Sequence, residues 1–394
     1  MTPRVLITDG EQRAVVAAVR GLARAGYAVS VMASSRPAAA QWSRDCARRL
    51  YAPSAAADRG EGLVDAVRRE LEREPYAALV PGSDAALRAF SRRREELQLL
   101  TRLGLPSESA TERAFDKLLL LEEAARHGLD GPASRTCESP AELAAAAQEV
   151  GYPLMLKPAR SVRTDGAWRQ QQSVIVRSPD ELAPAAETLA APYTLQRFHE
   201  GAPVVSVAGV LDGGALVGTA VARYDRTWPP SAGSASASTT IAAPEGLVER
   251  SLGLLNAIGW RGIFELEFLE LPDGRHATID LNPRVYGSLA LAISAGANLP
   301  AIWVGLLQGE RPAPIVARAG LHYRWEEGEV RALLRAVLAG DTDEMAAVLR
   351  PQRHTAWAFA RALDPGPLVA RTIVLGHMRG LPALRRFSRL APQA

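Results

Sequence analysis

The sequence predicts an α/β and α+β protein in which a parallel, doubly wound unit comes first, mixed sheets follow and a mainly helical segment ends the chain. Three observations support this fold class. Strand and helix patterns alternate over residues 1–105, strands and helices mix over residues 106–310, and the pattern after Arg311 is mainly helical. With 394 residues, 47% of them hydrophobic, the chain is long enough to bury two or three cores.

The first part of the chain opens with a β-α-β unit. An apolar strand over residues 4–10 precedes a helix with apolar periodicity that stops at Gly26, and a second strand follows at once. A further helix and a strand over residues 76–84 complete the unit. Because ligands of parallel sheets bind at the carboxyl ends of the strands, residues 9–10 and 82–84 are expected near a ligand, although Gly, Ser and Asp also serve as plain turn formers.

The middle of the chain mixes helices and strands. A helix over residues 111–128, with Thr111 as a candidate cap and Gly128 as its stop, places Lys117 in its second turn. The small, proline-rich stretch over residues 227–239 argues against regular structure, and we expect a loop there. Other helices are expected over residues 139–151 and 246–259, and strands over residues 153–159, 173–178, 193–198, 203–213, 215–225, 262–271 and 275–282.

Composition argues against several classes of protein. Lys and Arg number 46 against 43 Asp and Glu, so the net charge of +3 does not imply a nucleic-acid partner. Cys46 and Cys137 are too few for a disulfide framework or a structural zinc site, which fits the reducing cytoplasm. We expect no export signal and no membrane span, and the basic amphipathic tail over residues 379–394 is expected to be a packing helix rather than a membrane anchor.

Two strands joined by a Pro-Asp-Gly turn carry the candidate chemistry. Side chains alternate along a strand, so Glu265 and Glu267 share one face of the first strand, and Asp280, Asn282 and Arg284 align in the same way after the turn. If the strands pair antiparallel, these faces converge. Carboxylate and amide oxygens suit Mg²⁺, which takes phosphate oxygens as further ligands. The alternative is an exposed hairpin face, but the apolar neighbours of these acids make it less favourable, because a buried acidic face is costly without a cation.

Only two lysines occur in the chain, Lys117 and Lys157, whereas arginine is frequent. Lys157 follows the apolar run "PLML", so its ammonium is expected to point into the cleft that a buried strand borders. A compact ammonium fits between phosphate oxygens as a point charge, whereas the arginine fork favours planar, bidentate partners. The lysines therefore indicate a phosphate site, unless chance alone retained them.

With these lysines, "YTLQRF" and "EFLELPDGRHATIDLNPR", the sequence resembles the ATP-grasp superfamily from about residue 4 to residue 308. Residues 254–300 and the "WPP" stretch are most similar to the predicted carboxylate–amine ligase branch. The resemblance implies an ATP-grasp fold with four parts: a Rossmann-like pre-ATP-grasp domain over residues 1–105, a small lid subdomain over 106–195, a large subdomain with the Mg-ATP site over 196–310, and a mainly helical C-terminal extension over 311–394.

The resemblance also implies roles for single residues. Lys117 and Lys157 would contact the ATP phosphates and the adenine side, and Arg284 would hold the transferring phosphate or the acyl phosphate. Arg223 would be a second anion clamp in catalysis, unless it is a surface arginine of its strand. The hinge whose backbone binds adenine would comprise Gln196, Arg197 and Phe198, and the Mg²⁺ ligands would be Glu267, Asp280 and Asn282.

The sequence departs from the family pattern at two places. Asp280 stands where many members have Glu, and its shorter side chain leaves the number of magnesium ions open. The lid stretch over residues 159–172 has Gly166 as its only glycine, so its closure would not use a glycine-rich phosphate cradle. Residues 228–238 and 286–288 are expected to lie over the acyl-phosphate site and to line the substrate pocket, with Ser288 alternatively capping the next helix.

The activity implied by the resemblance is that of an ATP-dependent ligase. A carboxylate would take the γ-phosphate of ATP, and an amine, in this family usually an amino acid, would then attack the acyl phosphate to form an amide. ATP and Mg²⁺ are the implied cofactors, small-molecule acids and amines are the implied partners, and a homodimer is an allowed state. Three alternatives stay open: a kinase that stops at phosphoryl transfer, a nucleotide-binding regulatory protein and a structural partner protein.

Overall fold

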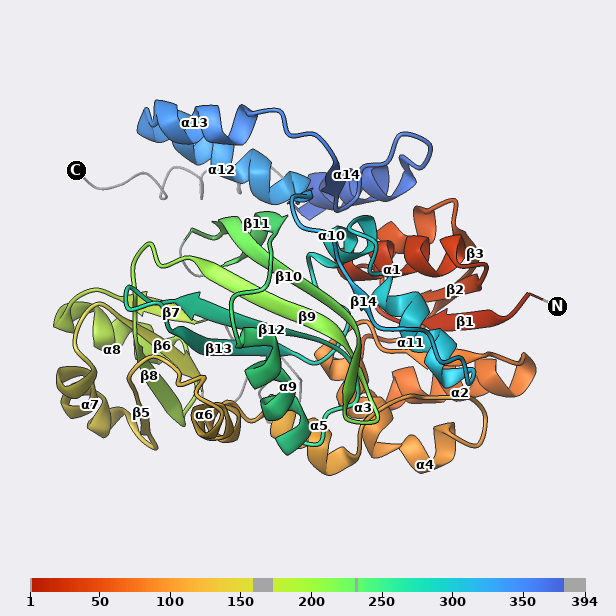
Figure 1. Cartoon of the computed structure of the whole chain (residues 1–394), viewed down its shortest axis with the longest axis horizontal. Coiled ribbons are helices and arrows are strands. Elements are labelled where there is room, and N and C mark those ends of the chain that lie inside the picture. Colours follow the sequence, from red (N-terminus) through yellow and green to blue (C-terminus); the bar gives the residue numbers. More distant parts are fainter. Residues whose placement is uncertain (1, 159–172, 231–232, 379–394) are drawn as a thin grey trace.

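The computed structural model describes residues 2–158, 173–230 and 233–378 and arranges them in three β-sheets with helices packed around them (Figure 1). The large sheet occupies the centre, the N-terminal sheet and a small antiparallel sheet flank it, and the last helices form a layer along one side (Figure 1). This arrangement confirms the α/β and α+β class. The stretch expected to be the lid, residues 159–172, and the tail, residues 379–394, lie outside the described residues.

The N-terminal sheet is parallel, with the strand order β3-β2-β1-β4. Its elements are β1 (Arg4–Ile7), α1 (Arg13–Arg24), β2 (Ala28–Ala33), the 3-10 turn η1 (Ala39–Trp42), β3 (Cys46–Tyr51), α2 (Glu61–Arg73), β4 (Ala78–Val80), α3 (Asp84–Arg92) and α4 (Arg94–Leu97). Helix α1 packs on one face of the sheet, and α2 and α3 pack on the other. The chain leaves β1 toward β2 on one side and β4 lies on the other, so the carboxyl ends of β1 and β4 meet at a switch point where ligands of such sheets bind.

The helix expected over residues 111–128 is in fact two helices, α5 (Glu108–Phe115) and α6 (Lys117–Arg126). Asp116 separates them because its backbone is extended and its carboxylate accepts hydrogen bonds from the N–H groups of Leu118 and Leu119, at 3.0 and 3.2 Å. This side chain caps α6. Lys117 is therefore the first residue of a new helix, and its placement in a second helical turn was wrong.

The small sheet is antiparallel throughout, with the strand order β5-β8-β6-β7. Its elements are β5 (Ser134–Cys137), the 3-10 turn η2 (Pro140–Glu142), α7 (Leu143–Val150), β6 (Leu154–Pro158), β7 (Val174–Val176), α8 (Pro179–Glu187) and β8 (Tyr193–Arg197). Apolar side chains of α7 and α8 join those of the strands in one buried core. The last strand, β8, leads directly into the large sheet.

The large sheet has the strand order β13-β12-β9-β10-β11-β15-β16, and β14 pairs with β10 beside it. The strands are β9 (Val204–Asp212), β10 (Ala215–Trp228), β11 (Ser234–Thr240), β12 (Gly262–Glu270), β13 (His276–Asn282), β14 (Ile315–Val316), β15 (His322–Arg324) and β16 (Thr355–Trp357). Along β9, Val205 and Val207 face the core that contains α9 (Leu247–Ala257), whereas Ala208 and Val210 face α10 (Leu289–Ser294) and α11 (Leu299–Leu307). We call these the α9 face and the α10 face of the large sheet.

Most of the stretch expected to be a loop over residues 227–239 is strand. Trp228 ends β10, and β11 begins at Ser234 and pairs with β10 on one edge and β15 on the other. The small side chains of β11 are nearly all buried, so pairing on both edges outweighs the weak strand propensity of serine and alanine. Residues 231 and 232 lie outside the described part of the chain.

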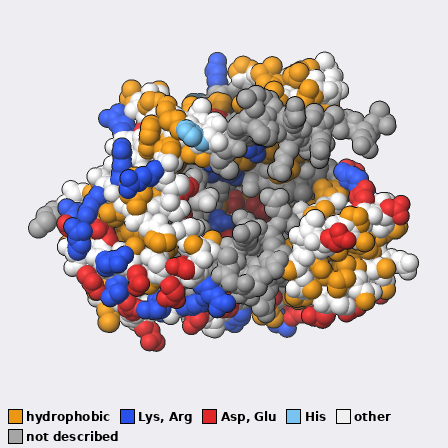
Figure 2. Space-filling model, turned by 180° about the vertical axis from the view of Figure 1, so that it is seen from behind, with side chains coloured by type: hydrophobic (Ala, Val, Ile, Leu, Met, Phe, Trp, Pro, Cys, Tyr) orange, Lys and Arg blue, Asp and Glu red, His pale blue; other side chains and the backbone are white. Residues whose placement is uncertain are grey.

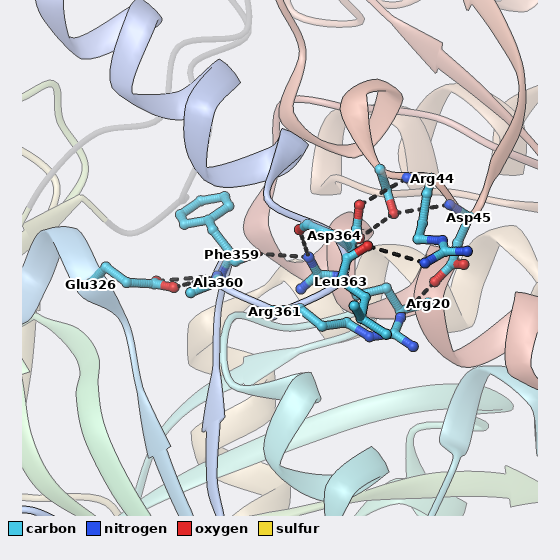
Figure 3. Close-up of polar contacts among 10 residues, drawn as sticks. Arg20, Arg44, Asp45, Glu326, Phe359, Ala360, Arg361, Leu363 and Asp364 are labelled. Carbon is cyan, nitrogen blue, oxygen red and sulfur yellow. Dashed lines mark hydrogen bonds and ion pairs between the residues drawn. The ribbon is translucent and has the colours of Figure 1, made fainter.

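The C-terminal extension is mainly helical in its described part, as expected, with α12 (Glu326–Ala339), α13 (Thr342–Leu349) and α14 (Gly366–Met378). It also supplies β14, β15 and β16, which the sequence did not indicate. Glu326 and Asp364 fix the segment between α13 and α14. Glu326 accepts hydrogen bonds from the N–H groups of Phe359 and Ala360, and Asp364 accepts one from the N–H of Arg44, in the loop before β3 (Figure 3). No helix in the described ranges is both long and apolar enough to pass through a bilayer.

Candidate active site

Four polar side chains share the α10 face of the β12–β13 hairpin. Glu267 lies opposite Asp280, and Glu265 lies opposite Asn282, in the antiparallel register of the two strands. The hairpin forms because Gly274, at φ +82°, closes the tight turn that the sequence predicts. The expected convergence of the two strand faces is present, and it depends on a register shift between Glu267 and Phe268 that brings Asp280 and Asn282 onto the face of Glu265 and Glu267.

Glu265 is 2% exposed and is surrounded by hydrogen-bond donors. Its Oε1 accepts from the hydroxyls of Tyr224, at 3.2 Å, and Ser288, at 3.3 Å, and its Oε2 accepts from the Asn282 amide at 3.1 Å. The Tyr224 hydroxyl also lies 2.7 Å from Glu267 Oε1. The two carboxylates thus share one phenolic proton as a hydrogen-bond donor, so part of the negative charge in the cluster is not compensated.

Burial governs the electrostatics of this acidic cluster. It raises the pKa of Glu265 and of Glu267 well above the ordinary value of 4.5, and repulsion adds to the effect, from Glu267 on Glu265 and from Asp280 on Glu267. A divalent cation would offset both penalties, because it compensates the charge that burial disfavours.

Both lysines approach this cluster. Lys117 Nζ lies 3.5 Å from Asp280 Oδ1, and Lys157 Nζ on β6 donates to Gln196 Oε1 at 2.6 Å. Burial, together with repulsion from Lys117, lowers the pKa of Lys157 to about 8, against the opposite effect of Asp280 and Glu267. The hydrogen-bond partner of Lys157 is a neutral amide, so a phosphate would supply the negative charge that stabilises its ammonium.

Arg284 joins the hairpin to the N-terminal sheet. Its Nε and Nη2 donate to the two carboxylate oxygens of Asp84 at 2.5 and 3.2 Å, and Nη2 lies 3.4 Å from Asn282 Oδ1. Asp84 is the first residue of α3, whose N-cap Ser83 accepts from the Ala86 N–H at 3.1 Å. Residues 82–84, expected near a ligand, therefore hold the arginine that is expected to bind one.

The expected hinge residues lie between the small and large sheets, at the end of β8. The N–H of Arg197 donates to Ala133 O at 2.7 Å, and the N–H of Phe198 donates to Pro153 O at 3.1 Å. These two donors are engaged inside the protein, so adenine would have to use carbonyl groups here or the residues that follow. Adenine binding at the hinge stays a prediction with that restriction.

The placement of Arg223 over the phosphate site was wrong. Arg223 pairs with Val205 in the sheet register and lies on the α9 face, where its guanidinium bonds Glu270 at 2.7 Å. The acidic cluster lies on the other face, and the β10 residue that reaches it is the next one, Tyr224. The reason is the strand period, since neighbouring residues of β10 point to opposite faces.

Residues 286–288 differ in how they are placed relative to the site. Tyr286 is 2% exposed and belongs to the core, so it does not line an open pocket. The carbonyl of Gly287 accepts from Arg13 Nε and the Tyr323 hydroxyl, at 3.3 and 2.9 Å. Ser288 stands at the N-cap position of α10 but makes no cap bond, because its hydroxyl is directed to Glu265.

The site is open to solvent on one side of the molecule. Acidic and basic side chains lie together on the floor of a hollow in the middle of the face drawn in Figure 2. Lys117, Asp280 and Arg284 are all partly exposed, whereas Glu265 is closed off beneath them. A ligand that reaches the site would therefore meet the outer charges before the inner carboxylate.

The donor set fits Mg²⁺ by its chemistry. Glu267, Asp280 and Asn282 offer two carboxylates and an amide oxygen, which are hard ligands, and burial raises the pKa of Glu267, as expected where a carboxylate lacks a compensating positive charge. No group of three or more His, Cys, Asp or Glu side chains in the described ranges is already arranged around a metal position. The assignment of these residues to a metal stays a prediction.

Sequence reasoning missed Tyr224 and the pairing of Asp84 with Arg284. A polar residue two positions beyond the buried Ala220 and Ala222 on the same face of β10 was the available signal for Tyr224. The expectation of a ligand at residues 82–84 was the signal for Asp84, although nothing in the sequence indicated which side chain it would meet.

Comparison with known proteins adds a match to a family model. Residues 203–329 match the family described as ATP-grasp in the biosynthetic pathway with Ter operon. This range contains β9 to β13 and hence the acidic cluster and Arg284. The carbamoyl phosphate synthase large chain of Thermus thermophilus is 28% identical over 282 residues, which are 69% of this chain and 26% of that protein. The chain thus spans about a quarter of the length of this relative.

Solved structures share the fold. Biotin carboxylase from Campylobacter jejuni superposes with a TM-score of 0.64 and 16% identity, covering 81% of this chain and 74% of that one. The L-amino acid ligase from Bacillus licheniformis gives a TM-score of 0.58 and 16% identity, covering 78% and 74%. At these identities the similarity establishes the fold.

Proposed function

We propose that this chain is an ATP-dependent ligase of the ATP-grasp superfamily that joins a carboxylic acid to an amine. The acid would be activated as an acyl phosphate with release of ADP, and the amine would displace phosphate to form an amide. This agrees with the carboxylate–amine ligase branch that the hairpin motif resembles.

A single observation carries this proposal. The register of β12 and β13 places Glu267 against Asp280 and Glu265 against Asn282, and the only two lysines of the chain approach the same cluster. One buried and two half-buried acids flanked by ammonium groups are the complement of a metal-bound triphosphate. An exposed structural hairpin would have no reason to bury Glu265.

Different residues would bind the metal ion and the phosphates in the first step. Glu267, Asp280 and Asn282 would hold Mg²⁺, which when bound offsets the charge of the phosphates. Lys157 and Lys117 would bind phosphate oxygens, and they would stabilise the charge that moves as the γ-phosphoryl group passes to the substrate carboxylate. Catalysis of this kind depends on positioning and electrostatics, so it needs no Ser, Cys or His nucleophile.

Arg284 would act on the acid in both steps. Its guanidinium would orient the carboxylate for attack on the γ-phosphorus and then stabilise the acyl phosphate, because it carries its charge next to Asn282 at the edge of the metal site. The amine would then attack the carbonyl carbon, form the C–N bond and release inorganic phosphate. Asp84 would fix the guanidinium plane through its two hydrogen bonds.

An ADP-release assay tests the proposal. The full chain, ATP and Mg²⁺ would be screened with carboxylic acids, with and without pooled amino acids, and the product mass would be measured. We expect continued ADP release to require both an acid and an amine. We also expect the variants Lys157→Ala and Glu267→Ala to abolish ADP release. ADP release with a phosphorylated acid and no use of any amine would point to a kinase instead.

Glu270→Gln is the matched control for Glu267→Ala. Glu270 lies three residues further along the same strand, but on the α9 face, where it bonds Arg223. Its replacement should leave ADP release unchanged. Normal turnover in both Lys157→Ala and Glu267→Ala would refute the site.

A further inference from the structure

A small pocket opens beside Arg284, between the N-terminal sheet and the large sheet, and about 30 Å³ of it is available to the centre of a water molecule. Val80 and Pro81 line it from the end of β4, Trp260 and Ile263 from the start of β12, and Trp303 from α11. None of the expected roles of the site residues uses this pocket.

The pocket continues the α10 face of the hairpin beyond the acidic cluster. Ile263 precedes Glu265 by two residues and therefore shares its face, and Arg284 follows Asn282 by two residues on the facing side. At about 3.3 Å per residue, the pocket begins roughly 7 Å along the strand from Glu265. Acidic cluster, arginine and pocket thus follow one another along a single line.

The side chains that line the pocket are mostly apolar, and none of those in the described ranges is acidic. The charged side chains among the described residues that line it are Arg284 and Arg261, and Arg261 pairs with Asp212 at 2.6 Å. An ammonium group or a second carboxylate would be desolvated here without a counter-charge of its own, which is costly. The chemistry of the pocket therefore fits the acid substrate rather than the amine.

Trp260, one of the lining residues, also carries a buried polar atom without a partner among the described residues. Trp260 is 5% exposed, and its indole Nε1 is buried without a hydrogen-bond partner in the described part of the protein. A buried donor without a partner costs free energy, and a ligand oxygen could satisfy it.

We infer that this pocket selects the acid substrate, and that it takes the uncharged, compact apolar body of a monocarboxylic acid whose carboxylate lies at Arg284. An oxygen in that body would accept a hydrogen bond from Trp260 Nε1. The inference rests on the proposed function for the fate of the acid, but binding in the pocket is separate from turnover.

Calorimetric titration of the full chain with small acids tests the inference. The probes are acetate, isocaproate, levulinate, which resembles isocaproate but carries a ketone oxygen, and succinate, whose body ends in a second charge. We expect isocaproate and levulinate to bind at least tenfold more tightly than acetate or succinate, since each apolar group in such a pocket is worth about tenfold or more.

The variant Trp260→Phe isolates the indole donor. It should lower the affinity for levulinate by about three- to tenfold, which is the effect of one lost hydrogen bond. The affinity for isocaproate should stay within about twofold of the wild-type value. The matched control is Trp325→Phe, because the Nε1 of Trp325 is also buried without a described partner but lies outside the pocket. This control should leave the affinities of both acids unchanged.

The outcomes separate the inference from the proposed function. The pocket inference is overturned if succinate or acetate binds as tightly as isocaproate, if no probe binds, or if Trp260→Phe weakens both longer acids equally. ADP release with succinate but not with isocaproate would overturn it while the ligase proposal stands. The expected binding pattern without ADP release from any acid would support the pocket and count against the ligase.

Discussion

Asp364 anchors the C-terminal extension, and Asp364→Ala should lower the free energy of unfolding by about 3–5 kcal/mol, the cost of removing one partner of a buried ion pair. The carboxylate is 2% exposed and accepts hydrogen bonds from Ser43 Oγ, the Arg44 N–H and Arg20 Nε at 2.7, 2.8 and 2.9 Å (Figure 3). Alanine would leave the mostly buried guanidinium of Arg20 without its counter-charge and two further donors without an acceptor.

Urea unfolding of the full chain, followed by tryptophan fluorescence, measures this loss. Asp45→Ala is the matched control, because Asp45 pairs with Arg361 at 2.7 Å between the same two parts of the chain (Figure 3). The Arg361 side chain is 48% exposed, so this variant should lose only about 0.2–1 kcal/mol. Equal losses in the two variants would refute the reasoning from burial.

A second check on Asp364 is the pH dependence of the difference in free energy of unfolding between the wild type and Asp364→Ala. Burial alone would raise the pKa of Asp364, but the hydrogen bonds from Ser43, Arg44 and Arg20 outweigh it and hold the pKa below its usual value. A depressed folded-state pKa contributes stability that is present above the unfolded value of about 3.9 and is lost as the pH falls through the folded value. The difference in free energy of unfolding between the wild type and Asp364→Ala should therefore become smaller at acidic pH.

Three further predictions concern the site. Lys157→Arg should reduce ADP release at least tenfold although it keeps the charge, since the planar guanidinium does not fit as a point charge; wild-type rates would contradict this. Because burial raises the pKa of Glu265 and Glu267, their stabilising protonated form is lost as the pH rises, so Mg²⁺ should raise the melting temperature more at roughly pH 8 than at roughly pH 6. In Glu265→Gln the Mg²⁺-induced rise in melting temperature should differ less between the two pH values. An equal rise at both pH values in the wild type would refute this prediction. Asp84→Asn should lower kcat by about tenfold or more through a misplaced Arg284 while leaving ATP affinity within about threefold, as separate kcat and ATP-binding measurements would show.

The hairpin that carries the acids could be predicted because its signals are local. A two-residue period decides which side chains share a face, and a Pro-Asp-Gly turn decides that the strands pair antiparallel. Glu265 and Asn282 stand opposite each other only because the register shifts between Glu267 and Phe268, since regular pairing from the turn would place Leu281 opposite Glu265. Nothing in the sequence indicated this shift.

The choice of Arg223 over Tyr224 failed because β10 gives no comparable signal. Both of its faces are buried along residues 218–222, so the sequence shows no contrast between an inner and an outer face. Strand β9 lies between β10 and β12, and its register with each of them decides which β10 side chains can reach the acids. That register depends on packing between segments distant in sequence, and a one-residue slip reverses the assignment.

The pairing of Asp84 with Arg284 depends on how two sheets meet, and it also limits what Arg284 can do. A guanidinium offers five N–H donors on fixed edges. Asp84 takes the Nε–Nη2 edge, so a substrate carboxylate has to approach the remaining Nη donors, of which Nη2 lies next to Asn282 and Nη1 bonds the Val285 carbonyl. The N-terminal sheet therefore directs the arginine toward the metal site and away from the nucleotide hinge. An acid bound there would have its carboxylate beside the acidic cluster and its body in the pocket lined by Trp260, which is the orientation that phosphoryl transfer to that carboxylate requires.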